Sequence, residues 1–124
     1  MTFFSGLSAS LSHAWRGLLL AFRTERSFRL LIAGGLIVVV LLILIPFERW
    51  ERIVLLLAVA SVLVLELVNS MVERLVDLVK PRLHGYVRDI KDLMAAAVLV
   101  AAIFTAVLAV MIFLPHLDFL LARV

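Results

Sequence analysis

Three long runs of apolar residues without a charged side chain organise the sequence. The first covers 30–47, the second is apolar from Ile53 to Leu65, and the third covers 93–114. At a rise of about 1.5 Å per residue, some 20 apolar residues in a helix cross the roughly 30 Å hydrocarbon core of a bilayer. The pattern therefore predicts three membrane-spanning helices, at about 29–46, 53–79 and 91–114. Helix-breaking prolines at Pro46, Pro81 and Pro115 are expected to close them.

The region before the first run has a different pattern. Its larger apolar residues recur every three or four positions, and its serines and arginines fall largely between them. The apolar positions are Phe4, Leu7, Leu11, Trp15, Leu18 and Phe22. A tryptophan and nearby arginines on such a period are typical of an amphipathic helix on a membrane surface. We expect this surface helix at about 4–27, with a helix of a soluble core as the alternative interpretation.

Composition places the chain in one class. With 124 residues, 65% of them hydrophobic, and a mean hydropathy of +1.21, the sequence is that of an all-α integral membrane protein with a single domain, 1–124. The absence of cysteine excludes disulfides and thiolate chemistry. A net charge of only +3, with basic residues beside the apolar runs, does not indicate a nucleic-acid partner.

Four polar residues lie at the end of the second apolar run. They are Glu66, Asn69, Glu73 and Asp77. Their spacing of 3, 4 and 4 places them on one narrow stripe of a helix. A carboxylate at the centre of a membrane-spanning helix costs roughly 3 kcal/mol, so such residues usually face a bundle interior or a wet cavity and mark function. This stripe is therefore the candidate functional site.

The distribution of basic residues predicts the orientation. They cluster before the first span and between the second and third, whereas the turn after the first span balances Arg49 and Arg52 with two glutamates. Cytoplasmic loops carry the excess of lysine and arginine, so the N-terminus and the second loop should be cytoplasmic. Glu25, the end of the stripe and the pair Lys91-Asp92 would then meet at one membrane face.

Such a cluster suits phosphoryl transfer, which depends on positioning and on neutralising charge. Magnesium takes one or two carboxylates together with phosphate oxygens, so Glu25 and Glu73 suffice as its protein ligands. Glu66, the deepest of the acids, is the candidate general base. The sequence has no Walker A motif, no kinase glycine-rich loop and no nucleophile elbow.

Several motifs together identify a family. Glu25-Arg26-Ser27-Phe28-Arg29 is followed by the stripe, which reads E-x-x-N-S-x-x-E-x-x-x-D, then by His84 and Lys91-Asp92 before an alanine-rich helix. These residues, and the order of surface helix and three spans, resemble the small bacterial membrane kinases of the diacylglycerol kinase and undecaprenol kinase family. The resemblance covers nearly the whole chain.

The resemblance implies a homotrimer that transfers the γ-phosphate of ATP to a lipid hydroxyl, in active sites between subunits of the bacterial inner membrane. Glu66 would be the catalytic base, with Asn69 as a supporting catalytic residue. Glu25 and Glu73 would hold Mg²⁺. Nucleotide would be positioned by Asp77, His84, Lys91 and Asp92. The surface helix, through Trp15 and its neighbours, would help to admit lipid.

Other interpretations stay open at this point. Leu31 and Arg82 depart from the family pattern, and the identity of the lipid is not fixed by the motifs. The glutamates of the stripe would otherwise make interhelical hydrogen bonds, and Lys91-Asp92 would otherwise begin a helix at the membrane surface. A non-catalytic membrane scaffold and a proton or ion pathway are the alternatives to a kinase.

Overall fold

The computed structural model describes residues 3–79, 82 and 84–122, and these are almost entirely helical. The helices are α1 (Phe3–Thr24), α2 (Arg26–Leu44), α3 (Arg49–Asp77), α4 (His84–Phe113), the 3₁₀ helix η1 (Leu114–His116) and the short α5 (Leu117–Leu121). Helices α2, α3 and α4 are long and apolar enough to cross a membrane. The expected all-α fold with three candidate spans is confirmed.

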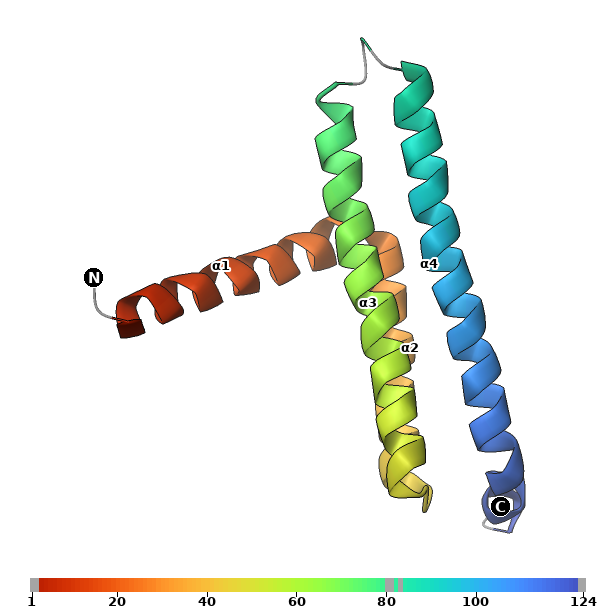
Figure 1. Cartoon of the computed structure of the whole chain (residues 1–124). Coiled ribbons are helices and arrows are strands. Elements are labelled where there is room, and N and C mark those ends of the chain that lie inside the picture. Colours follow the sequence, from red (N-terminus) through yellow and green to blue (C-terminus); the bar gives the residue numbers. More distant parts are fainter. Residues whose placement is uncertain (1–2, 80–81, 83, 123–124) are drawn as a thin grey trace.

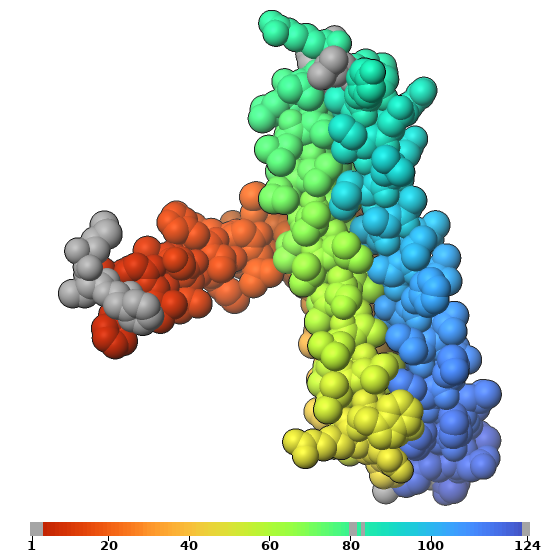
Figure 2. All heavy atoms as spheres, in the orientation of Figure 1, coloured from red at the N-terminus to blue at the C-terminus, as the bar shows by residue number. Residues whose placement is uncertain are grey.

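The helices form an open, elongated molecule (Figure 1). Consecutive helices α2, α3 and α4 run in alternating directions and pack in sequence, with α3 in contact with both α2 and α4. Helix α1 leaves this group at a steep angle, and Figure 2 shows it standing clear of the other helices along most of its length. With 29 residues, or about 44 Å of helix, α3 extends beyond the junction of α1 and α2. That α1 lies on a membrane surface stays a prediction.

Several helices begin or end at residues other than those expected from the sequence. Glu25 has an extended backbone that separates α1 from α2, so the first helix ends three residues before the expected position 27. A capping box between Glu48 and Glu51 starts α3 at Arg49, within the segment expected to be a turn. Helix α4 starts at His84 rather than near 91, because residues 84–91 contain no helix breaker besides one glycine at the second position. Pro81 lies outside the described residues.

Buried apolar side chains gather at the end of the molecule where α2 leads into α3. Leu42, Ile45, Phe47, Leu55 and Ile112 form this cluster. The rings of Phe47 and Phe113 meet edge to face with centroids 5.0 Å apart. Pro115 does end α4, but the chain continues into η1 and α5, which bring Phe119 and Leu120 against the same cluster. We call this the core end of the molecule.

One of the two adjacent glycines of α2, Gly35, permits close packing of this helix on α3. A Cβ atom at Gly35 would lie 2.9 Å from Cγ1 of Val59, whereas a Cβ atom at Gly34 would meet nothing within 4 Å. Of the two glycines, Gly35 is therefore the one at which a side chain would meet the neighbouring helix. The outer faces of the long helices expose large apolar side chains, as expected where lipid or another copy covers them.

Candidate active site

Glu66 is the buried acid of the site. Glu66 lies in the middle of α3 and is 4% exposed. Apolar residues such as Val62 and Leu67 lie near it on the same helix. The hydroxyl of Ser27, in the first turn of α2, donates a hydrogen bond to Oε1 of Glu66. The carboxylate therefore has a polar partner from a neighbouring helix, as a buried charge requires.

Glu25 is held by α3 as well. Its Oε1 accepts a hydrogen bond from Nη2 of Arg74 at 3.2 Å, and the same nitrogen donates to Oγ1 of Thr24 at 2.8 Å. The side chains of Arg74 and Glu25 are 46% and 24% exposed, so this ion pair sits at the edge of the site. Arg74 thereby fixes the break between α1 and α2 against α3.

The next turns of α3 carry the remaining stripe residues. Nδ2 of Asn69 lies 3.5 Å from Oε1 of Glu73, at the limit of a hydrogen bond. Nζ of Lys91, from α4, donates to Oδ1 of Asp77 at 2.7 Å and also lies within the electrostatic influence of Glu73. The structure therefore places Lys91 beside two of the acids with which the sequence grouped it.

Two of the predicted nucleotide residues are not joined to this group. Asp92 is exposed and makes no hydrogen bond or ion pair among the described residues. His84 begins α4 and lines a separate shallow hollow of about 360 Å³ with Arg82, Gly85, Tyr86 and Asp89. Arg82, which departs from the family pattern, thus lies beside His84.

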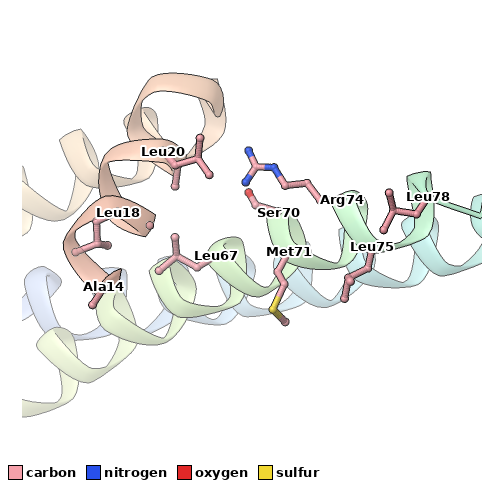
Figure 3. Close-up of a pocket in the computed structure, with 11 residues that line it drawn as sticks. Ala14, Leu18, Leu20, Leu67, Ser70, Met71, Arg74, Leu75 and Leu78 are labelled. Carbon is pink, nitrogen blue, oxygen red and sulfur yellow. The ribbon is translucent and has the colours of Figure 1, made fainter. Parts of the chain in front are cut away.

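An apolar pocket of about 770 Å³ separates α1 from α3 (Figure 3). Apolar side chains of both helices line it, including Leu18, Leu20 and Leu67, and Ser70 and Arg74 supply its polar groups. In Figure 3 the guanidinium of Arg74 extends beside Ser70. Ser70 is 4% exposed, and its Oγ has no hydrogen-bond partner among the residues that the structure describes. The pocket thus offers an apolar space with a few polar groups at one side, one helical turn from Glu66.

The oxygens of the stripe suit a hard divalent cation. Oδ1 of Asn69 is buried without a hydrogen-bond partner, and Glu73 has only the long contact from Asn69 among the recorded hydrogen bonds of the described chain. Carboxylate and amide oxygens are the ligands that Mg²⁺ takes. Across residues 3–79, 82 and 84–122, no group of three or more histidine, cysteine, aspartate or glutamate side chains is poised to hold a metal. A cation at these oxygens would therefore need further ligands from outside the described residues.

Sequence reasoning missed three participants in this geometry: Ser27, Ser70 and Arg74. Ser27 was noted only as part of a motif, and nothing in its spacing shows that its hydroxyl reaches α3. Ser70 and Arg74 follow Glu66 at intervals of four and eight, so helical periodicity alone places them near one side of α3. Helical periodicity is therefore the signal in the sequence that indicates Ser70 and Arg74.

Together, the fold and the cluster define an all-helical membrane protein whose second candidate span carries a buried carboxylate and, nearer its end, acids that meet amide and basic groups. The sequence profile of prokaryotic diacylglycerol kinases matches residues 12–113, and the chain belongs to this family. It is a lipid kinase of the diacylglycerol and undecaprenol kinase type, as its motifs predicted. Kinases of this kind use a nucleotide as phosphate donor and a lipid as acceptor.

Relatives of both types are similar to the chain along most of its length. Undecaprenol kinase of Bacillus subtilis (strain 168) is 33% identical over 108 residues, which are 87% of this chain and 88% of the relative. Diacylglycerol kinase of Synechocystis sp. is 37% identical over 112 residues, 90% of this chain but 64% of that longer relative. Diacylglycerol kinase of Escherichia coli (strain K12) is 29% identical over 106 residues, 86% of this chain and 87% of the relative.

Proposed function

We propose that the chain transfers the γ-phosphate of magnesium-bound ATP to the hydroxyl group of a membrane lipid, diacylglycerol or undecaprenol. The observation that carries this proposal is the position of Glu66. Its buried carboxylate lies one turn from an apolar pocket on one side of α3 and two turns from Glu73 on the same helix. A lipid would approach Glu66 through the apolar pocket, and the charged nucleotide would approach from the end of α3 that carries Glu73 and Asp77.

In the proposed reaction Glu66 accepts the proton of the lipid hydroxyl while the lipid oxygen forms a bond to the γ-phosphorus. The bond from that phosphorus to the oxygen bridging the β-phosphate breaks, and its electron pair leaves with ADP. The products are the lipid phosphate, ADP and a proton, which Glu66 afterwards releases to water. Asn69 lies one turn from Glu66 and beside Glu73, and would hold these two side chains in fixed positions relative to each other.

Glu25 and Glu73 would hold the magnesium ion, with phosphate oxygens completing its shell. When bound, the ion neutralises charge on the phosphates. Glu25 is paired with Arg74 in this structure, so Arg74 would have to share or release that carboxylate. Lys91 would bind phosphate from the α4 side, with Asp77 holding its ammonium group in place. His84, at the start of α4, and Asp92, the residue after Lys91, would contact the nucleotide.

The proposed assembly is a homotrimer in the bacterial inner membrane, with one kinase domain, 1–124, in each subunit. Exposed apolar side chains on the faces of α2 and α4 support burial against lipid or other subunits. The N-terminus and the site would face the cytoplasm, where nucleotide is available and where the basic residues lie by the positive-inside rule. Helix α1 would rest on the membrane surface and admit lipid into the pocket that it shares with α3.

The test is transfer of radiolabelled γ-phosphate from magnesium ATP by purified protein in lipid micelles, with diacylglycerol and undecaprenol offered side by side. Label in one lipid establishes the kinase and its acceptor together. Glu66→Gln should lower turnover by at least about a hundredfold, in line with the contribution of a general base. Glu48→Gln makes the same change at the core end of α3 and should leave turnover intact. Folded protein that labels neither lipid would instead support a scaffold or an ion pathway.

A further inference from the structure

The hydrogen bond of Ser27 reaches a carboxylate on another helix, unlike those of four other hydroxyl groups, although Thr24 also lies 3.3 Å from Oε1 of the adjacent Glu25. Ser8, Ser10, Thr24 and Ser61 each donate to a backbone carbonyl three or four residues earlier in their own helix. This local bond is the ordinary way for a helical hydroxyl to be satisfied. Ser27 instead reaches across to a buried carboxylate on α3. Its bond therefore links two helices through the candidate base.

Local structure explains why Ser27 is available for this bond. The break at Glu25 puts Ser27 in the first turn of α2. The carbonyl four residues earlier belongs to Arg23 and already accepts a hydrogen bond from Nη1 of Arg29 at 3.2 Å. Phe28, the next residue, is 3% exposed and anchors this turn in the packing. The hydroxyl is thus directed away from its own helix by a fixed piece of backbone.

The bond involves one of the two carboxylate oxygens of Glu66. Oε1 accepts from Ser27, and no second hydrogen bond of this carboxylate is recorded in the part of the chain that the structure describes. A glutamate side chain has several rotatable bonds, so an acid held at one oxygen loses much of its freedom to turn. Oε2 is then the oxygen left to accept a proton.

We propose that Ser27 is a positioning residue for phosphoryl transfer: its hydroxyl holds Oε1 of Glu66 so that Oε2 meets the hydroxyl of the lipid acceptor. This inference rests on the proposed role of Glu66 as the base. Ser27 touches neither lipid nor nucleotide in this scheme and acts only through Glu66. Its contribution should therefore appear in turnover and not in the binding of either substrate.

The first experiment replaces Ser27 and measures kcat and KM in lipid micelles. Ser27→Ala should lower kcat about tenfold, as expected for a misplaced catalytic group, with KM for ATP and for lipid unchanged. Ser27→Thr keeps the hydroxyl and should restore kcat to within about threefold of the parent. Ser27→Cys, a weaker donor of similar size, should fall between the two. Ser61→Ala is the matched control, because Ser61 donates to the carbonyl of Leu57 in its own helix.

A double-mutant cycle tests whether Ser27 acts through Glu66. Glu66→Asp retains a carboxylate but shortens the side chain by one methylene, which withdraws it from Ser27. In this background Ser27→Ala should change kcat by less than about twofold, because the bond is already lost. An equal tenfold loss in both backgrounds, full turnover in Ser27→Ala, or a Ser27→Thr protein as slow as Ser27→Ala would each overturn the inference.

These failures differ from failure of the proposed function. If Glu66→Gln abolishes turnover while Ser27→Ala retains it, Glu66 is still the base and only the positioning role is wrong. If the parent protein labels no lipid, or Glu66→Gln turns over normally, the proposed function is wrong and the positioning role falls with it.

Discussion

At the scale of single residues, the ion pair of Lys91 and Asp77 raises the question whether it stabilises the fold or serves the site. Its atoms are 2.7 Å apart, yet the two side chains are 31% and 50% exposed. Ion pairs with this exposure contribute little to folding, because water screens them. The pair with Asp77 therefore adds little to the stability of the two helices, and we propose that Lys91 serves a charged ligand.

Replacing Lys91 tests that interpretation. Lys91→Met should lower kcat/KM for ATP by about tenfold or more, because it removes a cation that would stabilise the phosphates in the transition state. The free energy of unfolding should stay close to that of the parent protein. Arg88→Met, one turn earlier on α4 at an exposed position, is the control and should affect neither quantity. A large loss of stability with unchanged kcat/KM would make Lys91 a structural residue.

At the scale of elements, the contact of α2 with α3 depends on a residue without a side chain. Gly35 is buried, and the atom nearest to its absent Cβ is Cγ1 of Val59. Valine is branched at Cβ and has little rotameric freedom in a helix, so it cannot easily move aside. The two helices must therefore separate locally if Gly35 gains a methyl group.

Gly35→Ala should consequently reduce the free energy of unfolding by about 1 to 3 kcal/mol, the usual range for overpacking. Gly34→Ala adds the same methyl group where nothing lies within 4 Å and should be neutral or slightly stabilising, since alanine favours helix. Unfolding of both variants by denaturant in mixed micelles provides the comparison. Equal effects at the two positions would show that Val59 does not limit the packing.

The elements also show what the sequence predicts and where it stops. The three spans follow from charge-free runs, and the stripe from Glu66 to Asp77 follows from helical spacing, because both depend on residues near in the chain. The break at Glu25 is different, since no proline or glycine marks it. The bond from Ser27 to Glu66 joins positions 39 apart in the sequence and depends on how α2 packs against α3. Such contacts are tertiary, and periodicity carries no information on them.

At the scale of the whole molecule, the buried apolar cluster and the candidate active site lie at opposite ends of α3. The acids of the site occupy its second half, whereas the buried apolar cluster surrounds its beginning. Glu51, in the first turn of α3, is buried there and lies 3.5 Å from Nε2 of His116. The other ring nitrogen of His116 lies 3.0 Å from the carbonyl oxygen of Ile112, and the ring packs against Phe47 at 4.6 Å. The family match ends at Phe113, so the segment that carries His116 lies beyond the matched residues.

This division predicts that a change at the core end affects folding without affecting the reaction. His116→Ala removes both the ring that packs on Phe47 and a partner of the buried Glu51, and should lower the free energy of unfolding by about 1 to 3 kcal/mol. The value of kcat, measured where the variant is fully folded, should stay within twofold of the parent, because the site is built on the other half of α3. His13→Ala, at an exposed histidine of α1, should leave the free energy of unfolding unchanged. A fall in kcat without a loss of stability would show instead that the core end is coupled to the site along α3.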